Sequence, residues 1–189
     1  MRLQRLQLAR GLTYAALFAF GLDLGGSLYE HLVIDTAWVD NPALIQPAQG
    51  GISRGAFWIP MHIALTVLLA AALWATFKER AVRKRVLWAI GLYAAMRIWT
   101  FAYFVPLALQ FESLQEPVLS PQMRSVAEQW VRWSWLRLPF VAGAAIALWL
   151  AARRLDSLLG VSAVTRGAAP RPTEPSGFPH GGRPSPASR

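Results

Sequence analysis

Long apolar stretches alternate with short clusters of basic residues along the chain. Four stretches, at about residues 12–32, 57–77, 86–109 and 133–152, are rich in aliphatic and aromatic side chains. A helix needs about 20 mostly apolar residues to cross the roughly 30 Å hydrocarbon core of a bilayer. Each stretch is long enough to cross, and all are too long for barrel strands. The pattern predicts an all-α integral membrane protein, a four-transmembrane-helix bundle.

The first stretch has a second interpretation. Arg2, Arg5 and Arg10 precede it, as basic residues precede the apolar core of a signal peptide, and residues 19–21 would suit cleavage. The apolar character nevertheless continues past that point to Leu28 and beyond. We therefore expect an uncleaved span.

Composition excludes the main alternatives to a membrane protein. The chain of 189 residues is 54% hydrophobic and 15% charged, whereas soluble domains carry about 25% charged residues and disordered chains are far less apolar. The net charge of +9 does not indicate nucleic acid, because the basic clusters bracket the apolar stretches instead of forming a patch. Cysteine is absent, which excludes disulfides, thiolate metal sites and cysteine nucleophiles.

The distribution of basic residues predicts the orientation. The loop at residues 78–85 holds five basic residues and one acid, whereas the loops before and after it are richer in acids. Short loops with excess Lys and Arg stay in the cytoplasm. We expect a multi-pass protein of the cell membrane, in contact with the lipid bilayer, with both termini cytoplasmic.

The end of the chain differs in composition from the rest. Six of the 13 prolines lie in residues 159–189, together with glycine, serine and arginine. Such a segment buries too little apolar surface to offset the chain entropy lost on folding. The sequence therefore divides into a four-span membrane domain, residues 1–158, and a disordered cytoplasmic tail, residues 159–189.

Ionisable side chains lie inside the predicted spans, although a charge there costs about 2.5–3.5 kcal/mol on insertion scales. They are Asp23, Glu30 and His31 in the first span, His62 in the second, Arg97 in the third and Arg137 in the fourth. The predicted topology brings these side chains toward the outer half of the bundle and leaves the inner half apolar.

Two interpretations of this convergence stay open. Two acids, Asp23 and Glu30, can pair with two arginines, Arg97 and Arg137, and so hold the bundle together. The same groups can instead line a pocket that is open to the outer side, because ionisable residues within a membrane are candidates for function.

Further patterns carry less weight. His31, His62 and Glu30 could form a metal set, but no sequence spacing fixes them, so we expect no metal and no cofactor. His62 is the better candidate for acid–base chemistry. Gly21 and Gly25 form a small-xxx-small pair that would allow close approach of another helix, or a homodimer.

Four short stretches resemble one known family. They are Gly26-Ser27-Leu28-Tyr29-Glu30, Phe57-Trp58-Ile59-Pro60-Met61-His62, Tyr103-Phe104-Val105-Pro106 and Gln129-Trp130-Val131-Arg132-Trp133-Ser134-Trp135-Leu136-Arg137. Across about residues 11–154 the chain resembles the anthrone oxygenase-like family of small four-span membrane proteins. The family pattern usually has asparagine where this chain has Ser134.

The resemblance implies an activity and a site. The family is named for enzymes that oxidise anthrones to quinones with dioxygen and without a tightly bound cofactor. It implies Glu30, His62 and Arg137 as candidate catalytic residues. Trp130 and Trp133 would form an aromatic wall of the substrate site, where Arg97 and Ser134 complete the candidate contacts.

Three functions therefore remain as hypotheses. The first is an oxygenase-like or redox enzyme that acts on a small lipophilic molecule. The second is a carrier or binding protein for a small solute. The third is a structural or partner-binding membrane subunit in which the ionic groups only fix the bundle.

Overall fold

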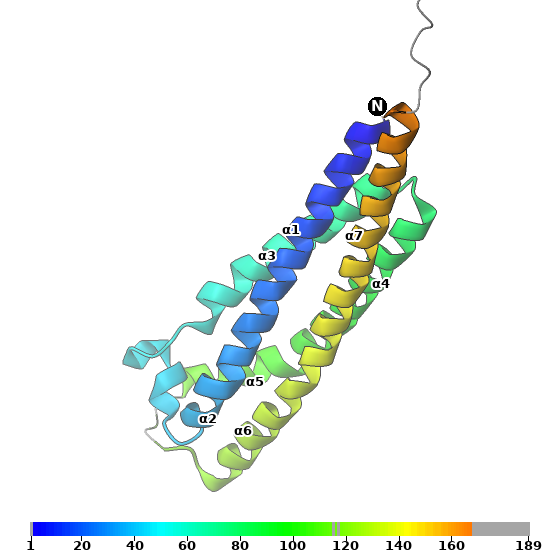
Figure 1. Ribbon diagram of the computed structural model, residues 1–189. Coiled ribbons are helices and arrows are strands. Elements are labelled where there is room, and N and C mark those ends of the chain that lie inside the picture. Colours follow the sequence, from blue (N-terminus) through cyan, green and yellow to red (C-terminus); the bar gives the residue numbers. More distant parts are fainter. Residues whose placement is uncertain (1, 115, 117, 168–189) are drawn as a thin grey trace, which may run out of the picture.

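The computed structural model describes residues 2–114, 116 and 118–167, with side chains through residue 160. Four long helical segments lie side by side in an elongated bundle (Figure 1). Each is long and apolar enough to cross a membrane: Arg2–Trp38, Arg54–Thr76, Arg80–Ser113 and Pro121–Gly160. The predicted fold class, an all-α four-helix bundle of membrane type, is confirmed.

Three of the four segments contain irregular turns. The first consists of α1 (Arg2–Tyr29), the π-helical turn η1 (Glu30–Ile34) and α2 (Asp35–Trp38). Two 3₁₀ turns, η2 (Pro42–Ile45) and η3 (Pro47–Gln49), lead to the uninterrupted helix α3 (Arg54–Thr76). The third consists of α4 (Arg80–Trp99), the π turn η4 (Thr100–Phe104) and α5 (Val105–Ser113). The fourth consists of α6 (Pro121–Ser134), the 3₁₀ turn η5 (Trp135–Arg137) and α7 (Leu138–Gly167).

The first segment is longer than its apolar stretch. It begins at Arg2 instead of residue 12, because polar contacts support its basic first turns. Arg2 pairs with Glu79 at 3.3 Å, and Arg5 Nε donates to the carbonyl of Ala75 at 3.1 Å. At about 1.5 Å per residue, its 37 residues exceed the thickness of the hydrocarbon core, so its ends project beyond that layer.

Helix α7 also extends further than the sequence indicated. It continues to Gly167, through residues 159–167 that composition assigned to the tail. The remainder of the predicted disordered tail, residues 168–189, lies outside the described residues.

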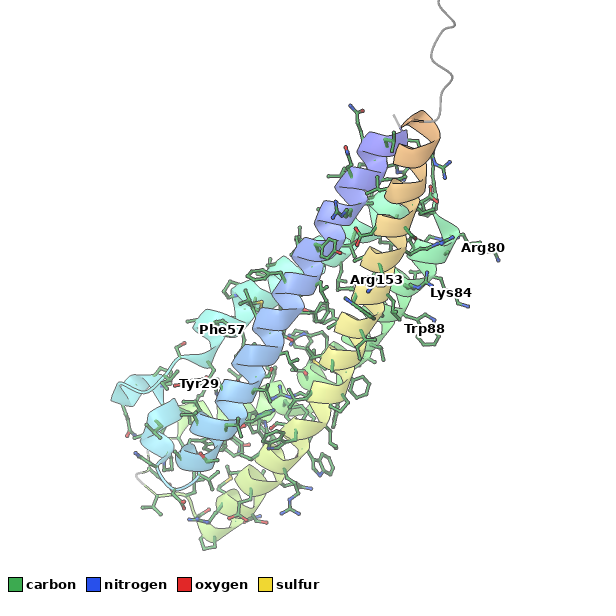
Figure 2. All side chains as sticks on the ribbon, in the orientation of Figure 1. Tyr29, Phe57, Arg80, Lys84, Trp88 and Arg153 are labelled. Carbon is green, nitrogen blue, oxygen red and sulfur yellow. The ribbon has the colours of Figure 1, made fainter. Side chains whose placement is uncertain are left out.

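One end of the bundle, which we call the terminal end, holds the start of α1, the α3–α4 turn and the end of α7 (Figure 1). Arg80 and Lys84 project from the bundle there (Figure 2). The adjoining core is apolar and packs around small side chains, which let the four helices approach one another: Ala9, Ala16, Ala72, Ala89 and Ala144 are at most 1% exposed.

The opposite end, which we call the loop end, holds α2, η2, η3, α5 and α6 (Figure 1). An aromatic cluster closes it, and its buried members include Trp38, Phe104, Phe111 and Trp130. Trp130 Nε1 donates to the carbonyl of Phe104 at 3.1 Å, which fixes α6 against η4. This aromatic cluster is separate from the alanine-rich core of the terminal end.

Prolines explain two of the irregular turns. Pro139 has no N–H to bond the carbonyl of Trp135, and the N–H of Leu138 bonds it instead, which makes η5 a 3₁₀ turn. Pro106 cannot donate to the carbonyl four residues before it, and there the N–H of Val105 reaches back to Thr100 in a π turn. The π turn η1 contains no proline.

Candidate functional site

A cavity of about 470 Å³ lies among the helices in the loop-end half of the bundle. Its lining comes from all four segments: the end of α1 with η1, the start of α3, the end of α4 with η4 and α5, and the α6–α7 junction. All three irregular turns, η1, η4 and η5, contribute lining residues. The cavity therefore lies where the helices depart from regular geometry.

The structure brings most of the predicted site residues together at this cavity. Glu30, His62, Arg97, Trp130 and Arg137 all line it. Asp23 and His31, the other ionisable groups predicted within the spans, line it as well. The expected convergence of ionisable side chains from separate helices is thus present in the fold.

Two predicted residues lie outside the lining. Ser134 is fully buried behind it, where its Oγ lies 3.3 Å from Nδ1 of His31. Trp133 is 38% exposed and packs its ring against Tyr103, with the ring centroids 5.2 Å apart. Ser134 therefore supports a cavity residue, whereas Trp133 packs outside the cavity.

The salt bridges of the two acids involve neither Arg97 nor Arg137. Glu30 pairs with Arg54, whose Nη1 lies 3.5 Å from Glu30 Oε1, and Nε of Arg54 also donates to Glu112 at 3.2 Å. Arg54 begins α3, three residues before the apolar stretch at residues 57–77. It is only 8% exposed, because α3 starts beneath the aromatic cluster, with the guanidinium 5.1 Å from the Trp130 ring centre.

Arg97 and Arg137 form no salt bridge in the part of the chain that the structure describes, although Asp23 lies near enough to interact electrostatically with both. Arg97 lies over the ring of Phe101 at 4.5 Å, and Arg137 lies over the ring of Phe104 at the same distance. Arg137 Nε also donates to the carbonyl of Ser134. Aromatic faces thus hold two cations at the cavity without neutralising them.

Glu30 and His62 share a neighbour, Trp58. The indole Nε1 of Trp58 donates to Glu30 Oε2 at 2.7 Å, and the indole ring stacks on the His62 ring with centroids 5.6 Å apart. Because Glu30 also pairs with Arg54, its carboxylate is already engaged from two sides. Trp58 couples the first span to the second across the cavity.

Asp23 is 1% exposed and has no hydrogen bond to either carboxylate oxygen from the described residues. The nearest cationic candidate is Nδ1 of His62, at 3.9 Å from Asp23 Oδ1. The hydroxyl of Tyr93 lies 3.2 Å from that same Nδ1. The floor of the cavity therefore holds an acid that a bound molecule can contact.

His31 is anchored more closely than His62. Its Nδ1 lies 2.7 Å from Oδ2 of Asp35, and both side chains are at most 1% exposed. Oδ1 of Asp35 accepts a hydrogen bond from Trp38 Nε1 at 3.1 Å. The imidazole packs on Trp135, with ring centroids 4.9 Å apart.

One side of the cavity opens between α3 and the η4–α5 segment. Lining residues on both sides of this gap stay exposed: Ile59 at 64%, Phe101 at 61% and Leu109 at 61%. These side chains are apolar and belong to helices long enough to span a membrane. We therefore expect this opening to face the lipid.

Sequence reasoning missed four polar contributors to this region: Arg54, Trp58, Glu112 and Asp35. Asp35 had a readable signal, because it follows His31 by four residues and would share its face if the helix continued past residue 32. The sequence held no such signal for Arg54 and Glu112, because the contact between them depends on the path of a loop.

The glycine pair does not pack within the chain. A Cβ at Gly21 or Gly25 would meet nothing within 4 Å, whereas one at Gly26 would lie 2.9 Å from Cε1 of Phe57. Gly26, not the predicted pair, allows the close approach of α1 and α3.

Among the described residues, no group of three or more His, Asp or Glu side chains is arranged to hold a metal ion. Comparison of the chain with protein-family models, with curated proteins and with solved structures gives no match.

Proposed function

We propose that this protein is a membrane enzyme that binds a small lipophilic molecule with an acidic proton in the inter-helix cavity. The molecule enters sideways from the bilayer between α3 and α5. Its proton passes to a basic side chain, and arginines stabilise the anion that remains. By the resemblance at residues 26–30 and 129–137, the substrate is an anthrone-like aromatic and the co-reactant is dioxygen.

The observation that supports this proposal best is the position of Arg97 and Arg137 at a cavity with an apolar open side. Arg97 and Arg137 lie over aromatic rings, and neither forms a salt bridge among the described residues. Fixed cations in a water-poor site stabilise a developing anion.

The apolar rim supports a lipophilic substrate. Ile59, Phe101 and Leu109 offer side-chain contacts but no hydrogen bonds, and they connect the polar interior with the lipid-facing surface. A flat aromatic molecule with one acidic group suits a site in which an apolar entrance leads to a polar interior. A strongly hydrated solute would have to lose its hydration shell before it reached the arginines, and this dehydration costs free energy.

The proposed topology places both termini and the basic α3–α4 turn in the cytoplasm of a cell-membrane protein. The loop end, and with it the cavity, then lies in the outer half of the bilayer. This orientation is supported by the five basic residues at positions 78–85.

The chemistry of this proposal is balanced with dioxygen alone. A methylene carbon loses a proton to the enzyme, and its carbanion adds to dioxygen. The peroxide anion takes that proton back, and the hydroperoxide then loses water to leave a ketone. The overall change is CH₂ + O₂ → C=O + H₂O. The chain's own part is to bind the aromatic, to accept the first proton and to stabilise the carbanion.

Turnover of anthrone by the purified protein tests the proposal. Oxygen consumption and quinone absorbance are followed together in lipid nanodiscs. Arg137→Gln is expected to lower turnover about 10²-fold, because it removes a cation that faces the developing charge. Arg132→Gln, which changes an exposed arginine of α6, is the matched control and is expected to match the wild type.

Equal turnover in the wild type and Arg137→Gln would contradict the proposed role of the arginine. Binding of anthrone with no oxygen consumption would instead favour the carrier function. Saturable uptake of anthrone into vesicles, lost in Arg137→Gln, would then establish that alternative.

A further inference from the structure

We propose that His31, held by Asp35, is the group that accepts the substrate's proton in this cavity. This assignment deepens the function proposed above and rests on it. It names a catalytic base other than His62 and Glu30, the two that the sequence favoured.

The first support is the burial and geometry of the pair. The side chains of His31 and Asp35 are 1% and 0% exposed, and Nδ1 lies 2.7 Å from Oδ2. The second oxygen of Asp35 is occupied by Trp38 Nε1 at 3.1 Å, which prevents the carboxylate from rotating. A carboxylate that orients one imidazole nitrogen leaves the other free for chemistry.

The second support is the identity of the two neighbours of Nδ1. Ser134 donates its hydroxyl hydrogen to the carbonyl of Val131 at 2.7 Å, so its oxygen is left to accept from Nδ1 at 3.3 Å. The carboxylate of Asp35 is also an acceptor. Both neighbours require a hydrogen on Nδ1, which makes neutral His31 the Nδ1–H tautomer.

The third support is the opposite nitrogen. Nε2 of His31 is buried and has no hydrogen-bond partner among the described residues, and His31 lines the cavity. In the Nδ1–H tautomer, Nε2 carries a lone pair and is a proton acceptor. The packing of the ring on Trp135 limits its rotation.

The other candidates are less suited to the role. Glu30 already accepts from Trp58 at one oxygen and pairs with Arg54 at the other, so both of its oxygens are engaged. Nδ1 of His62 lies 3.9 Å from Asp23, beyond hydrogen-bond distance, and its neighbour Tyr93 is a neutral hydroxyl. Only His31 has a buried carboxylate at hydrogen-bond distance to stabilise its charged form.

The step conserves atoms and charge. The bond from the substrate to its acidic hydrogen breaks, the hydrogen joins Nε2, and the electron pair stays on the substrate. Asp35 then faces an imidazolium, while Arg137 and Arg97 face the substrate anion from other parts of the lining. No oxidant takes part in this transfer.

Asp35→Asn gives a test that keeps the shape of the site. The oxygen of the new amide can still accept from Trp38, which directs the amide NH₂ at Nδ1. Nδ1 must then accept, so the hydrogen moves to Nε2, which becomes a donor. The ¹⁵N shifts of His31 are expected to report Nδ1–H in the wild type and Nε2–H in Asp35→Asn.

A lipophilic nitrophenol, whose anion absorbs visible light, probes the transfer itself. Quenching of tryptophan fluorescence measures binding, and the phenolate band measures ionisation. Calorimetry in two buffers of different ionisation enthalpy counts the protons released. In the wild type we expect binding, a phenolate band and no proton release, because the protein keeps the proton.

His31→Asn and His31→Gln are expected to bind the nitrophenol with little change but to lose the phenolate band at least about tenfold, or to form it with proton release to the buffer. Asp35→Asn is expected to behave in the same way. Asp40→Asn, an exposed carboxylate of the loop end, is the matched control and is expected to match the wild type.

Opposite outcomes overturn the assignment. A phenolate band without proton release in both folded His31 variants would show that another group holds the proton, and loss of the band in His62→Asn alone would identify that group. An Nε2–H tautomer in the wild type would also contradict it. Failure of the wild type to bind the nitrophenol would instead contradict the proposed function. Circular dichroism confirms the fold of each variant.

Discussion

The carboxylate of Glu30 joins two spans at the cavity. It accepts from Trp58 on α3 at 2.7 Å and lies 3.5 Å from Arg54 at the start of the same helix. Arg54 in turn reaches Glu112 on α5. The first, second and third segments are therefore connected through one buried guanidinium.

Glu30→Gln tests this connection. The amide oxygen can still accept from Trp58, but the charge that faces Arg54 is lost. Because Arg54 keeps Glu112, we expect a loss of about 2 kcal/mol, less than for a buried cation left with no partner. Thermal unfolding in detergent, followed by circular dichroism, measures the change.

Arg54→Gln is expected to destabilise the bundle more than Glu30→Gln, since it leaves two carboxylates without their cation. Asp40→Asn, which breaks an exposed pair with Arg124, is the control and is expected to change little. If Glu30→Gln and Asp40→Asn unfold at the same temperature as the wild type, the ionic connection contributes nothing to stability.

At the residue scale the sequence predicted which ionisable groups gather but not their partners. Glu30, His62, Arg97 and Arg137 were placed at one depth because each position within an apolar span has a defined height. Partners depend on side-chain direction and on loop paths, which periodicity does not encode. Arg54 is the clearest case. It precedes the apolar stretch at residues 57–77, yet in the fold it is buried and pairs with both Glu30 and Glu112.

Among the elements, the π turn η1 has the largest effect on the site. Two adjacent residues, Glu30 and His31, both face the cavity from it, and the helix continues into α2 so that Asp35 reaches His31. Hydrogen bonds from Thr36 Oγ1 to the carbonyls of Leu32 and Val33 support the widened turn. Such turns often occur at functional positions in helices.

The apolar stretches predicted the four long helical segments. Only some of the irregular turns could be predicted from the sequence. Pro106 and Pro139 signal η4 and η5, since each removes a backbone donor. No proline signals η1, and a regular helix was the natural expectation there. The ends of α1 and α7 also extend past the apolar stretches, because polar contacts support helix outside the hydrocarbon.

Gly26 and Gly25 form a matched pair for testing the packing of α1 on α3. A Cβ at Gly26 would lie 2.9 Å from the ring of Phe57, and one at Gly25 would meet nothing within 4 Å. We expect Gly26→Val to cost about 1–3 kcal/mol in detergent by overpacking. Gly25→Val is expected to leave the stability of the monomer unchanged.

Equal stability of these two variants would contradict the packing of α1 on α3 described above. A change in oligomeric state in Gly25→Val, measured by light scattering, would instead support the homodimer that the sequence suggested for Gly21 and Gly25.

The whole molecule is divided into an apolar half and a polar half. The terminal end is packed with alanines, and the loop end holds a cavity beneath an aromatic cluster. This arrangement suits a protein whose rigid half anchors it in the bilayer while the other half receives a ligand. The sequence predicted this division from the distribution of charge alone.

Single cysteines test the proposed topology, because the natural chain has none. Ala48 lies between the first two spans and Lys84 near the α3–α4 turn, and both are exposed. In intact cells a membrane-impermeant maleimide is expected to label Ala48→Cys and to spare Lys84→Cys until lysis. The reverse pattern would place the cavity in the inner half of the bilayer.

The central claim is that the cavity holds a small lipophilic molecule through its arginines. Mass spectrometry of the protein, extracted with its own lipids into nanodiscs, tests this claim most directly. We predict that the wild type retains an aromatic molecule with an acidic group, and that Arg137→Gln loses it while Arg132→Gln keeps it. Identical small-molecule spectra from all three proteins would contradict the claim.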